Sequence, residues 1–115
     1  MEKNLVAQCR RMIKDAGARA RKKGKPFDID ANTVKKLWIH QKGMCALSGV
    51  VMKFGSSPTK HMHTMSLDCI QPTGGYVEGN IQLLSQCVNV AKSTLSIDEF
   101  KEMCTQVSFY GSGSR

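Results

Sequence analysis

Three polar residues in the second half of the chain have types and spacing that suit a divalent metal site: Asp68, Asn80 and Asn89. Asp68 is the only acid in the segment 61–70. One carboxylate and one amide supply oxygen ligands, which suit a hard ion such as Mg²⁺ that keeps its waters for a phosphate. The alternative is structural: Asp68 caps a turn, and the two asparagines are polar residues of a turn and of a helix face.

The elements that must position these residues are a strand, a turn, a second strand and a helix. Residues 61–70 are extended in character, and the residues at 72–75 (PTGG) give a strong turn signal. A second short strand is expected over 80–84 and a helix over 85–94. Such a unit places a carboxylate of the first strand beside a ligand on the helix.

The N-terminal half is predicted to be mainly helical. Residues 2–23 carry an apolar stripe at helical spacing, formed by Leu5, Cys9, Met12, Ile13 and Ala16. A short extended piece is expected over 27–29. A second helix is expected over 31–42, with Asp30 or Asn32 as its N-cap.

The remaining segments are short. Residues 45–51 are expected to form a strand and turn, and residues 52–60 a polar loop. A C-terminal helix over 96–106 is predicted from a capping box in which Glu99 follows Ser96 by three positions.

The positive charge is concentrated at the N-terminus. The formal net charge is +8, and residues 1–25 hold nine of the 17 Lys and Arg residues but only Glu2 and Asp15 of the nine acids. A basic helix of this kind favours contact with nucleic acid phosphates. The alternative is a solvated helix face. A membrane surface is disfavoured because the segment has no Trp or Phe to anchor it.

Length and composition limit the class of protein. A chain of 115 residues corresponds to one domain and excludes a large multidomain enzyme. The sequence has no membrane-length apolar run and no signal-like N-terminus, so we expect a cytoplasmic protein (the host cytoplasm, if it is encoded by a phage). The five cysteines include no C-x-x-C pair and are expected to be reduced thiols.

The pattern around these residues resembles the HNH endonuclease family. The similarity lies in SLDCI at 66–70, Gly75-Tyr76, GNIQLL at 79–84, and then Asn89 and Lys92. It is closest to small phage and homing-type members with a Ser-x-Asp-Arg-Ile block. The resemblance implies an α+β fold with a ββα-metal core of two short antiparallel strands and a helix. Two helices precede this core, and a short C-terminal helix follows it.

The resemblance also implies a site and an activity. Asp68 and Asn89 match the residues that hold one Mg²⁺ or Mn²⁺ ion, and Asn80 matches an asparagine that orients the base or contacts the scissile region. The implied reaction is hydrolysis of DNA phosphodiester bonds by nicking; a double-strand cut would need two copies. Contacts to the backbone of double-stranded DNA are expected from Arg10, Arg11, Arg19, Arg21, Lys22, Lys23, Lys25 and Lys92. Either a monomer or a homodimer is compatible with this.

Two departures from the family pattern concern the base and structural zinc. Cys69 follows Asp68 where the family has His or Arg, and a thiol is an unusual base for water. Among the histidines, His63 is the first candidate for the base, ahead of His61 and His40. No structural zinc is expected, because the matching positions are Cys45, Ser48, Ser85 and Val88, with a single thiol.

Three functions remain open from the sequence. The preferred one is a metal-dependent nuclease with a basic segment at 1–25, an HNH-like domain at 26–106 and a flexible tail at 107–115. The second is a DNA-binding or regulatory protein of the same fold that has lost cleavage, which Cys69 favours. The third is a protein-interaction module that uses the loop 52–65.

Overall fold

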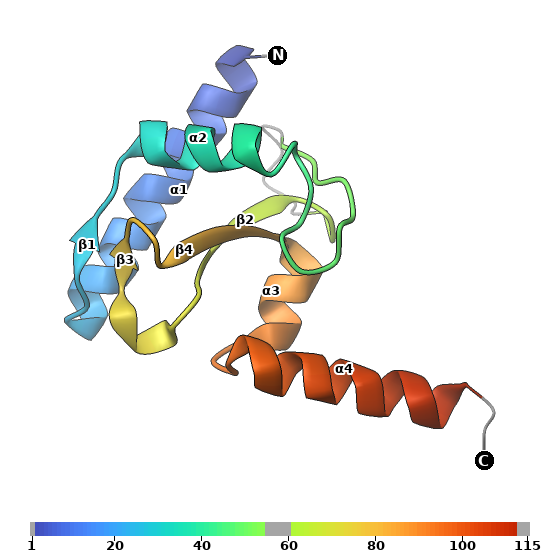
Figure 1. Cartoon of the computed structure of the whole chain (residues 1–115). Coiled ribbons are helices and arrows are strands. Elements are labelled where there is room, and N and C mark those ends of the chain that lie inside the picture. Colours follow the sequence, from blue (N-terminus) through green and yellow to red (C-terminus); the bar gives the residue numbers. More distant parts are fainter. Residues whose placement is uncertain (1, 55–60, 113–115) are drawn as a thin grey trace.

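The structure has an α+β arrangement in which helices pack around one short antiparallel strand pair, and a second short strand pair lies at an edge of the molecule (Figure 1). The computed structural model describes residues 2–54 and 61–112. The elements in chain order are α1 (Glu2–Lys23), β1 (Phe27–Asp28), α2 (Ala31–His40), β2 (Met65–Cys69), η1 (Pro72–Gly74), β3 (Tyr76–Val77), β4 (Ile81–Ser85), α3 (Gln86–Lys92) and α4 (Ile97–Gly111). The predicted fold class is confirmed, with two helices before the strand–turn–strand–helix unit and one after it.

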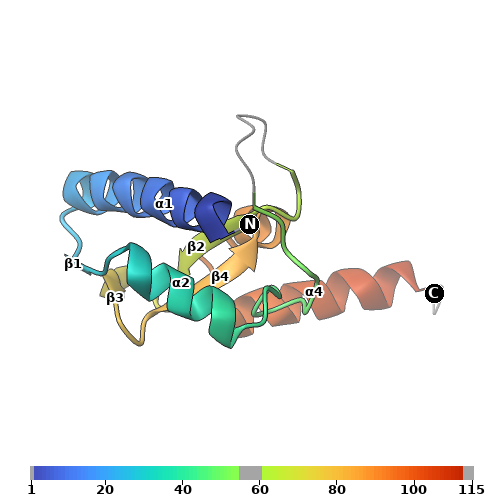
Figure 2. The same cartoon turned by 90° about the horizontal axis from the view of Figure 1, so that it is seen from above.

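Strands β2 and β4 form the centre of the molecule. They pair in antiparallel register, with Leu67 opposite Leu83 and Asp68 opposite Gln82. Leu67 and Leu83 are buried, since the two strands lie between α1 and α2 (Figure 2). Helix α3 follows β4 without a loop and packs on both strands.

A second strand pair, which the sequence did not predict, ties the turn to the N-terminal half. β1 and β3 pair in parallel, and the Tyr76 amide donates a hydrogen bond of 2.9 Å to the Pro26 carbonyl. Gly75 makes this approach possible: its φ is +77°, and a Cβ there would lie 2.5 Å from the Pro26 oxygen. Other residues are therefore excluded at Gly75 on both conformational and steric grounds.

Helix α1 belongs to the same hydrophobic core as the sheet. Its predicted stripe is confirmed: Leu5, Cys9, Met12 and Ala16 are buried, and Ile13 packs against them. The helix contacts α2 and β2. The helix ends at Lys23, and the hydrophobic core includes residues on both sides of the predicted boundary between 25 and 26.

Helix α2 begins as predicted, with Asp30 as its N-cap. The Thr33 amide donates a hydrogen bond of 2.9 Å to Asp30 Oδ1, and the Thr33 hydroxyl bonds the same oxygen. These bonds lower the pKa of the Asp30 carboxyl, because they stabilise its charged form. The helix ends at His40, slightly before the predicted end at 42.

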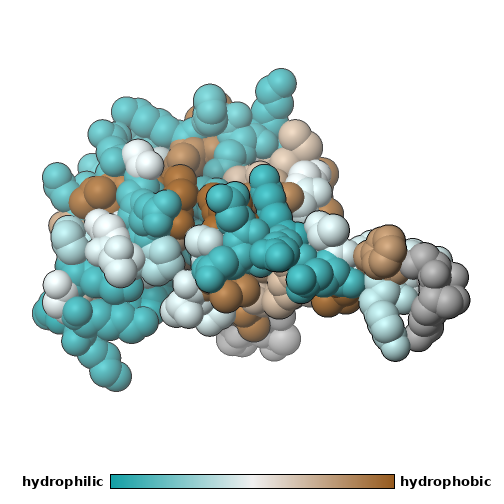
Figure 3. All heavy atoms as spheres, turned by 60° about the horizontal axis from the view of Figure 1, so that its bottom comes forward, coloured by the Kyte–Doolittle hydropathy of each residue, from teal (hydrophilic) through white to brown (hydrophobic). Residues whose placement is uncertain are grey.

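Helix α4 is longer than predicted. Its capping box is confirmed, with the Glu99 amide donating to Ser96 Oγ at 3.1 Å. The helix continues to Gly111, past the predicted end at 106, so residues 107–111 of the predicted flexible tail are helical. No glycine or proline interrupts residues 97–110. The helix extends away from the body of the molecule (Figures 1 and 3).

The other predicted segments are described in part. The predicted strand and turn at 45–51 is a turn closed by a single bridge between Met44 and Val51. Most of the predicted loop 52–60 lies outside the described residues. Across the described ranges, no helix is long and apolar enough to cross a membrane.

Candidate functional site

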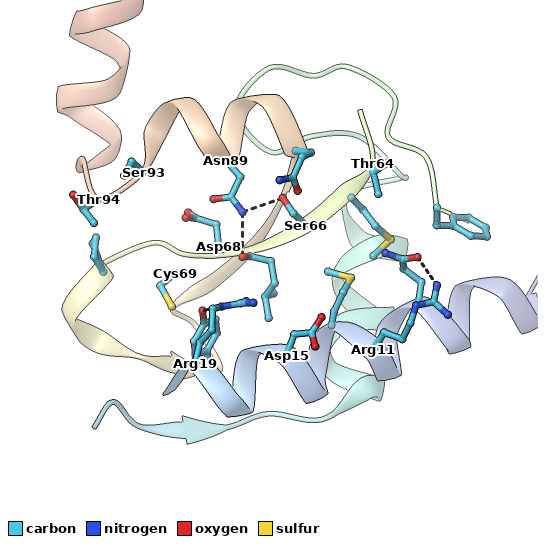
Figure 4. Close-up of a pocket in the computed structure, with 18 of the residues that line it drawn as sticks. Arg11, Asp15, Arg19, Thr64, Ser66, Asp68, Cys69, Asn89, Ser93 and Thr94 are labelled. Atoms are coloured by element: carbon cyan, nitrogen blue, oxygen red, sulfur yellow. Dashed lines mark hydrogen bonds between the residues drawn. The ribbon is translucent and has the colours of Figure 1, made fainter. Parts of the chain in front are cut away.

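A cleft of about 690 Å³ separates α1 from the strand β2 and helix α3. Its walls come from segments far apart in the sequence: Asp15 and Arg19 on α1 face Asp68 and Cys69 on β2, with Asn89 on α3 (Figure 4). The two predicted metal ligands, Asp68 and Asn89, therefore line one cavity. Asn80 does not line it.

Asp68 is buried, and both of its carboxylate oxygens have partners on the protein. Gln82, opposite it on β4, donates a hydrogen bond of 2.9 Å to Oδ2. The ammonium of Lys92 lies 3.3 Å from each carboxylate oxygen. Lys92 has 0% of its surface exposed and Asp68 has 6%. The prediction that Lys92 contacts nucleic acid at the surface is therefore wrong: the packing of α3 on β2 turns its side chain inward, onto Asp68.

Asn89 is oriented by β2. Its side-chain amide donates hydrogen bonds to Ser66 Oγ at 3.0 Å and to the Leu67 carbonyl at 3.3 Å (Figure 4). Among the residues that the structure describes, none donates a hydrogen bond to Asn89 Oδ1. This oxygen is thus held at the cleft with its lone pairs available.

The donor set fits a hard divalent ion in its chemistry. It consists of the Asp68 carboxylate and the Asn89 amide oxygen, and Mg²⁺ and Mn²⁺ both accept oxygen ligands together with water. Within residues 2–54 and 61–112, no group of three His, Cys, Asp or Glu residues could hold a metal. An ion at Asp68 would also meet the positive charge of Lys92.

Asn80 has a structural role in the turn. Its Oδ1 accepts a hydrogen bond from the Gln71 amide at 2.9 Å, and its Nδ2 donates to the Gln71 and Gly75 carbonyls at 3.1 and 2.8 Å. The side chain closes the turn that joins β2 to β4. These contacts favour the structural interpretation of Asn80 over a role at the scissile bond.

Replacing Asn80 with alanine is expected to lower the free energy of unfolding by about 2–3 kcal/mol, at about 1 kcal/mol for each lost hydrogen bond. Urea unfolding followed by circular dichroism measures this change. Asn32→Ala, at an exposed position of α2, is the matched control and should change stability by about 0.5 kcal/mol or less. Equal stability of the two variants would contradict this role of Asn80.

Cys69 does not have the properties of a general base. Burial raises the pKa of its thiol, and the neighbouring Asp68 carboxylate raises it further, while Lys25, Lys92 and Tyr76 act in the opposite direction. The net shift is upward, so the thiol is protonated at neutral pH. A protonated thiol cannot accept a proton from water.

The histidines are placed differently from one another. His61 lines the cleft, whereas His63, the first candidate from the sequence, and His40 do not. His61 Nδ1 accepts a hydrogen bond of 3.1 Å from the His63 backbone amide. The Nδ1 atom of His63 is buried and has no hydrogen-bond partner among the described residues. The arrangement therefore does not favour His63 as the base.

Apart from the buried Lys92, the predicted cations divide into two sets. Arg11, Arg19, Lys23 and Lys25 line the cleft, while Arg10, Arg21 and Lys22 do not. Helical geometry explains the division, because positions 11, 15, 19 and 23 recur on one face of α1. Two further lining residues, Lys53 and Tyr76, were missed as functional candidates. The Gly-Tyr pair in the turn was the available signal for Tyr76.

Tyr76 and the turn hold two of the cleft cations in place. Arg19 Nε donates a hydrogen bond of 3.3 Å to the Tyr76 hydroxyl, and the guanidinium lies 5.9 Å from the centre of the Tyr76 ring. Lys25 Nζ donates to the Pro72 carbonyl at 2.6 Å. The positive charge at this end of the cleft is thereby fixed by contacts with the β2–β4 connection.

Comparisons with known proteins add one finding. No protein-family model matches the chain, and no curated protein matches it either. Among solved structures, the chain is similar to the rare-cutting HNH restriction endonuclease PacI, with a TM-score of 0.64 and 17% sequence identity. The match covers 92% of this chain and 80% of that chain. The protein described here therefore has an HNH-type fold.

Proposed function

We propose that this protein is a divalent-metal-dependent endonuclease that hydrolyses phosphodiester bonds of DNA, making one nick for each site. The observation that carries the proposal is the meeting of Asp68 and Asn89 in one cleft whose opposite wall is the basic face of α1. Two oxygen donors on one side and fixed cations on the other suit a bound phosphodiester. The HNH-type fold supports the same activity.

The chain's own residues have distinct roles in this proposal. Asp68 and Asn89 would hold Mg²⁺ or Mn²⁺, which supplies Lewis-acid stabilisation of charge that develops on the phosphate. Arg19 and Lys25, fixed by Tyr76 and Pro72, would bind phosphates on either side of the scissile bond. Most of this binding energy is independent of the base sequence.

A second function is favoured by two specific observations. Asp68 is already neutralised by Lys92, and its neighbour Cys69 is a protonated thiol. These two features suit a DNA-binding or regulatory protein of HNH-type fold without cleavage activity. Such a protein would use the basic cleft alone.

A nicking assay on supercoiled plasmid separates the two functions. The protein is incubated at low salt with Mg²⁺ or Mn²⁺, beside samples with EDTA. Nicking that depends on the metal is expected for an endonuclease. A plasmid that is shifted on a gel but remains supercoiled with both metals would instead support the second function.

The division of the α1 cations gives a matched test of the binding surface. Replacing Arg11, Arg19 and Lys23 together with glutamine is expected to weaken DNA binding and to reduce its salt dependence by roughly 0.9 in slope for each lost phosphate contact. Fluorescence anisotropy with a labelled duplex at several salt concentrations measures both changes.

The control triple variant replaces Arg10, Arg21 and Lys22 with glutamine. It removes the same charge and the same residue types from the same helix, but from positions that do not line the cleft. Its salt slope should stay close to that of the wild type. If the two triple variants lose affinity equally, DNA does not bind in the cleft.

A further inference from the structure

The pairing of Lys92 with Asp68 is the most unusual charge arrangement in the described structure. Lys92 is the largest fully buried side chain, in a chain whose other described cations are exposed or half-buried. Burying an ammonium is costly unless it is paired and hydrogen-bonded. Here the two Asp68 oxygens, both at 3.3 Å, provide that pairing.

Asp68 is the partner that the described structure gives to the Lys92 ammonium. Within the described ranges, the Asp68 carboxylate is the sole acceptor or anion that the structure gives to its Nζ. Asp68 in turn receives the ammonium and the Gln82 amide. The charge of the carboxylate is therefore balanced by a cation of the chain itself. Asp68 lines the cleft, and Lys92 lies behind it.

The two proposed metal ligands, Asn89 Oδ1 and the Asp68 carboxylate, thus differ in whether a side chain of the protein already occupies them. Asn89 Oδ1 is oriented by Ser66 and Leu67 and accepts no hydrogen bond from a described residue. The Asp68 carboxylate is oriented as well, but it is bound to a cation of the chain. A divalent ion would have to share this carboxylate with the Lys92 ammonium, which is fully buried and lies 3.3 Å away.

We propose that Lys92 is the resident counter-cation of Asp68 and competes with a divalent ion for that carboxylate, so that the free protein binds metal weakly. This inference rests on the proposed function for the identity of the site. In it, Lys92 is a positioning residue that sets the metal affinity through Asp68. Removing its charge strengthens metal binding at the carboxylate.

The test measures Mn²⁺ binding in the absence of DNA, from the electron paramagnetic resonance signal of free Mn²⁺. Lys92→Met and Lys92→Gln are expected to bind Mn²⁺ at least about tenfold more tightly than the wild type, since a unit charge within 4 Å is removed at a buried site. Lys101→Met, which removes a charge from exposed α4, should bind like the wild type. In Asp68→Ala/Lys92→Met the gain should disappear.

Two results would overturn the proposal. The first is equal Mn²⁺ affinity in the wild type and in folded Lys92 variants. The second needs no Lys92 variant: tight, stoichiometric Mn²⁺ binding by the wild type that is lost in Asn89→Ala would show that Lys92 does not compete. The second measurement decides the question even where the Lys92 variants do not fold.

The proposed endonuclease activity is tested by a separate measurement, the nicking of plasmid DNA. A wild type that never nicks DNA contradicts the endonuclease activity, whereas the competition is read from metal binding without DNA. If the Lys92 variants bind Mn²⁺ tightly and no form of the protein nicks, the competition holds and the nuclease proposal is wrong.

Discussion

Replacing Asp68 with alanine is expected to lower the free energy of unfolding by about 3–5 kcal/mol, because it leaves the fully buried ammonium of Lys92 without a counter-charge. Lys92→Met should be destabilising for the converse reason, since the carboxylate then keeps only the Gln82 amide. The double variant Asp68→Ala/Lys92→Met removes both charges and should recover most of the loss. Chemical denaturation of the four proteins measures these differences as a double-mutant cycle.

Additive effects in this cycle would contradict the prediction, because they would mean that the two charges do not stabilise one another. The expected coupling also changes how loss of activity in Asp68→Ala is interpreted. An inactive single variant could have lost a metal ligand or its fold. The double variant keeps the fold without the carboxylate and therefore separates the two causes.

Replacing Asn89 with alanine is expected to reduce the rate of metal-dependent nicking by about 10²-fold, on the scale of losing one fixed electrostatic group at a reacting phosphate. The variant loses the Oδ1 atom that is the proposed metal ligand at the cleft, and it loses two hydrogen bonds to β2. DNA affinity should change little, because the cations of α1 are untouched. Initial rates on supercoiled plasmid, with binding measured separately, test both statements.

Val90→Ala is the matched control for this variant. Val90 lies next to Asn89 on α3 but is 67% exposed and does not line the cleft. It should nick at the rate of the wild type. If Asn89→Ala retains the activity of Val90→Ala, the metal is not held by Asn89 and the proposed site is wrong.

Several parts of this structure could be predicted from the sequence because they depend on near neighbours. The N-caps at Asp30 and Ser96 involve a partner three residues away. The apolar stripe of α1 and the strand–turn–strand–helix order follow from local periodicity and from turn residues. The end of α4 was less predictable, because no glycine or proline marks an end near residue 106 and the helix continues to Gly111.

The contacts at the site depended on packing between distant segments. Asn80 is an example: its spacing from Asn89 suggested chemistry, but its side chain satisfies backbone groups at Gln71 and Gly75. His61 and His63 are another, because two residues along an irregular segment separate a side chain that lines the cleft from one that does not.

The sequence by itself determined the HNH-like succession of elements, the presence of Asp68 on a strand and of Asn89 on the helix that follows, and the concentration of cations in one helix. Only the tertiary structure decided which of these cations face the cleft, and that Lys92 neutralises Asp68 rather than meeting a phosphate at the surface. The physical reason is the range of the interactions involved. Caps and periodic stripes depend on residues within a turn or two, whereas the Asp68–Lys92 pair joins positions 24 residues apart and exists because α3 packs on β2.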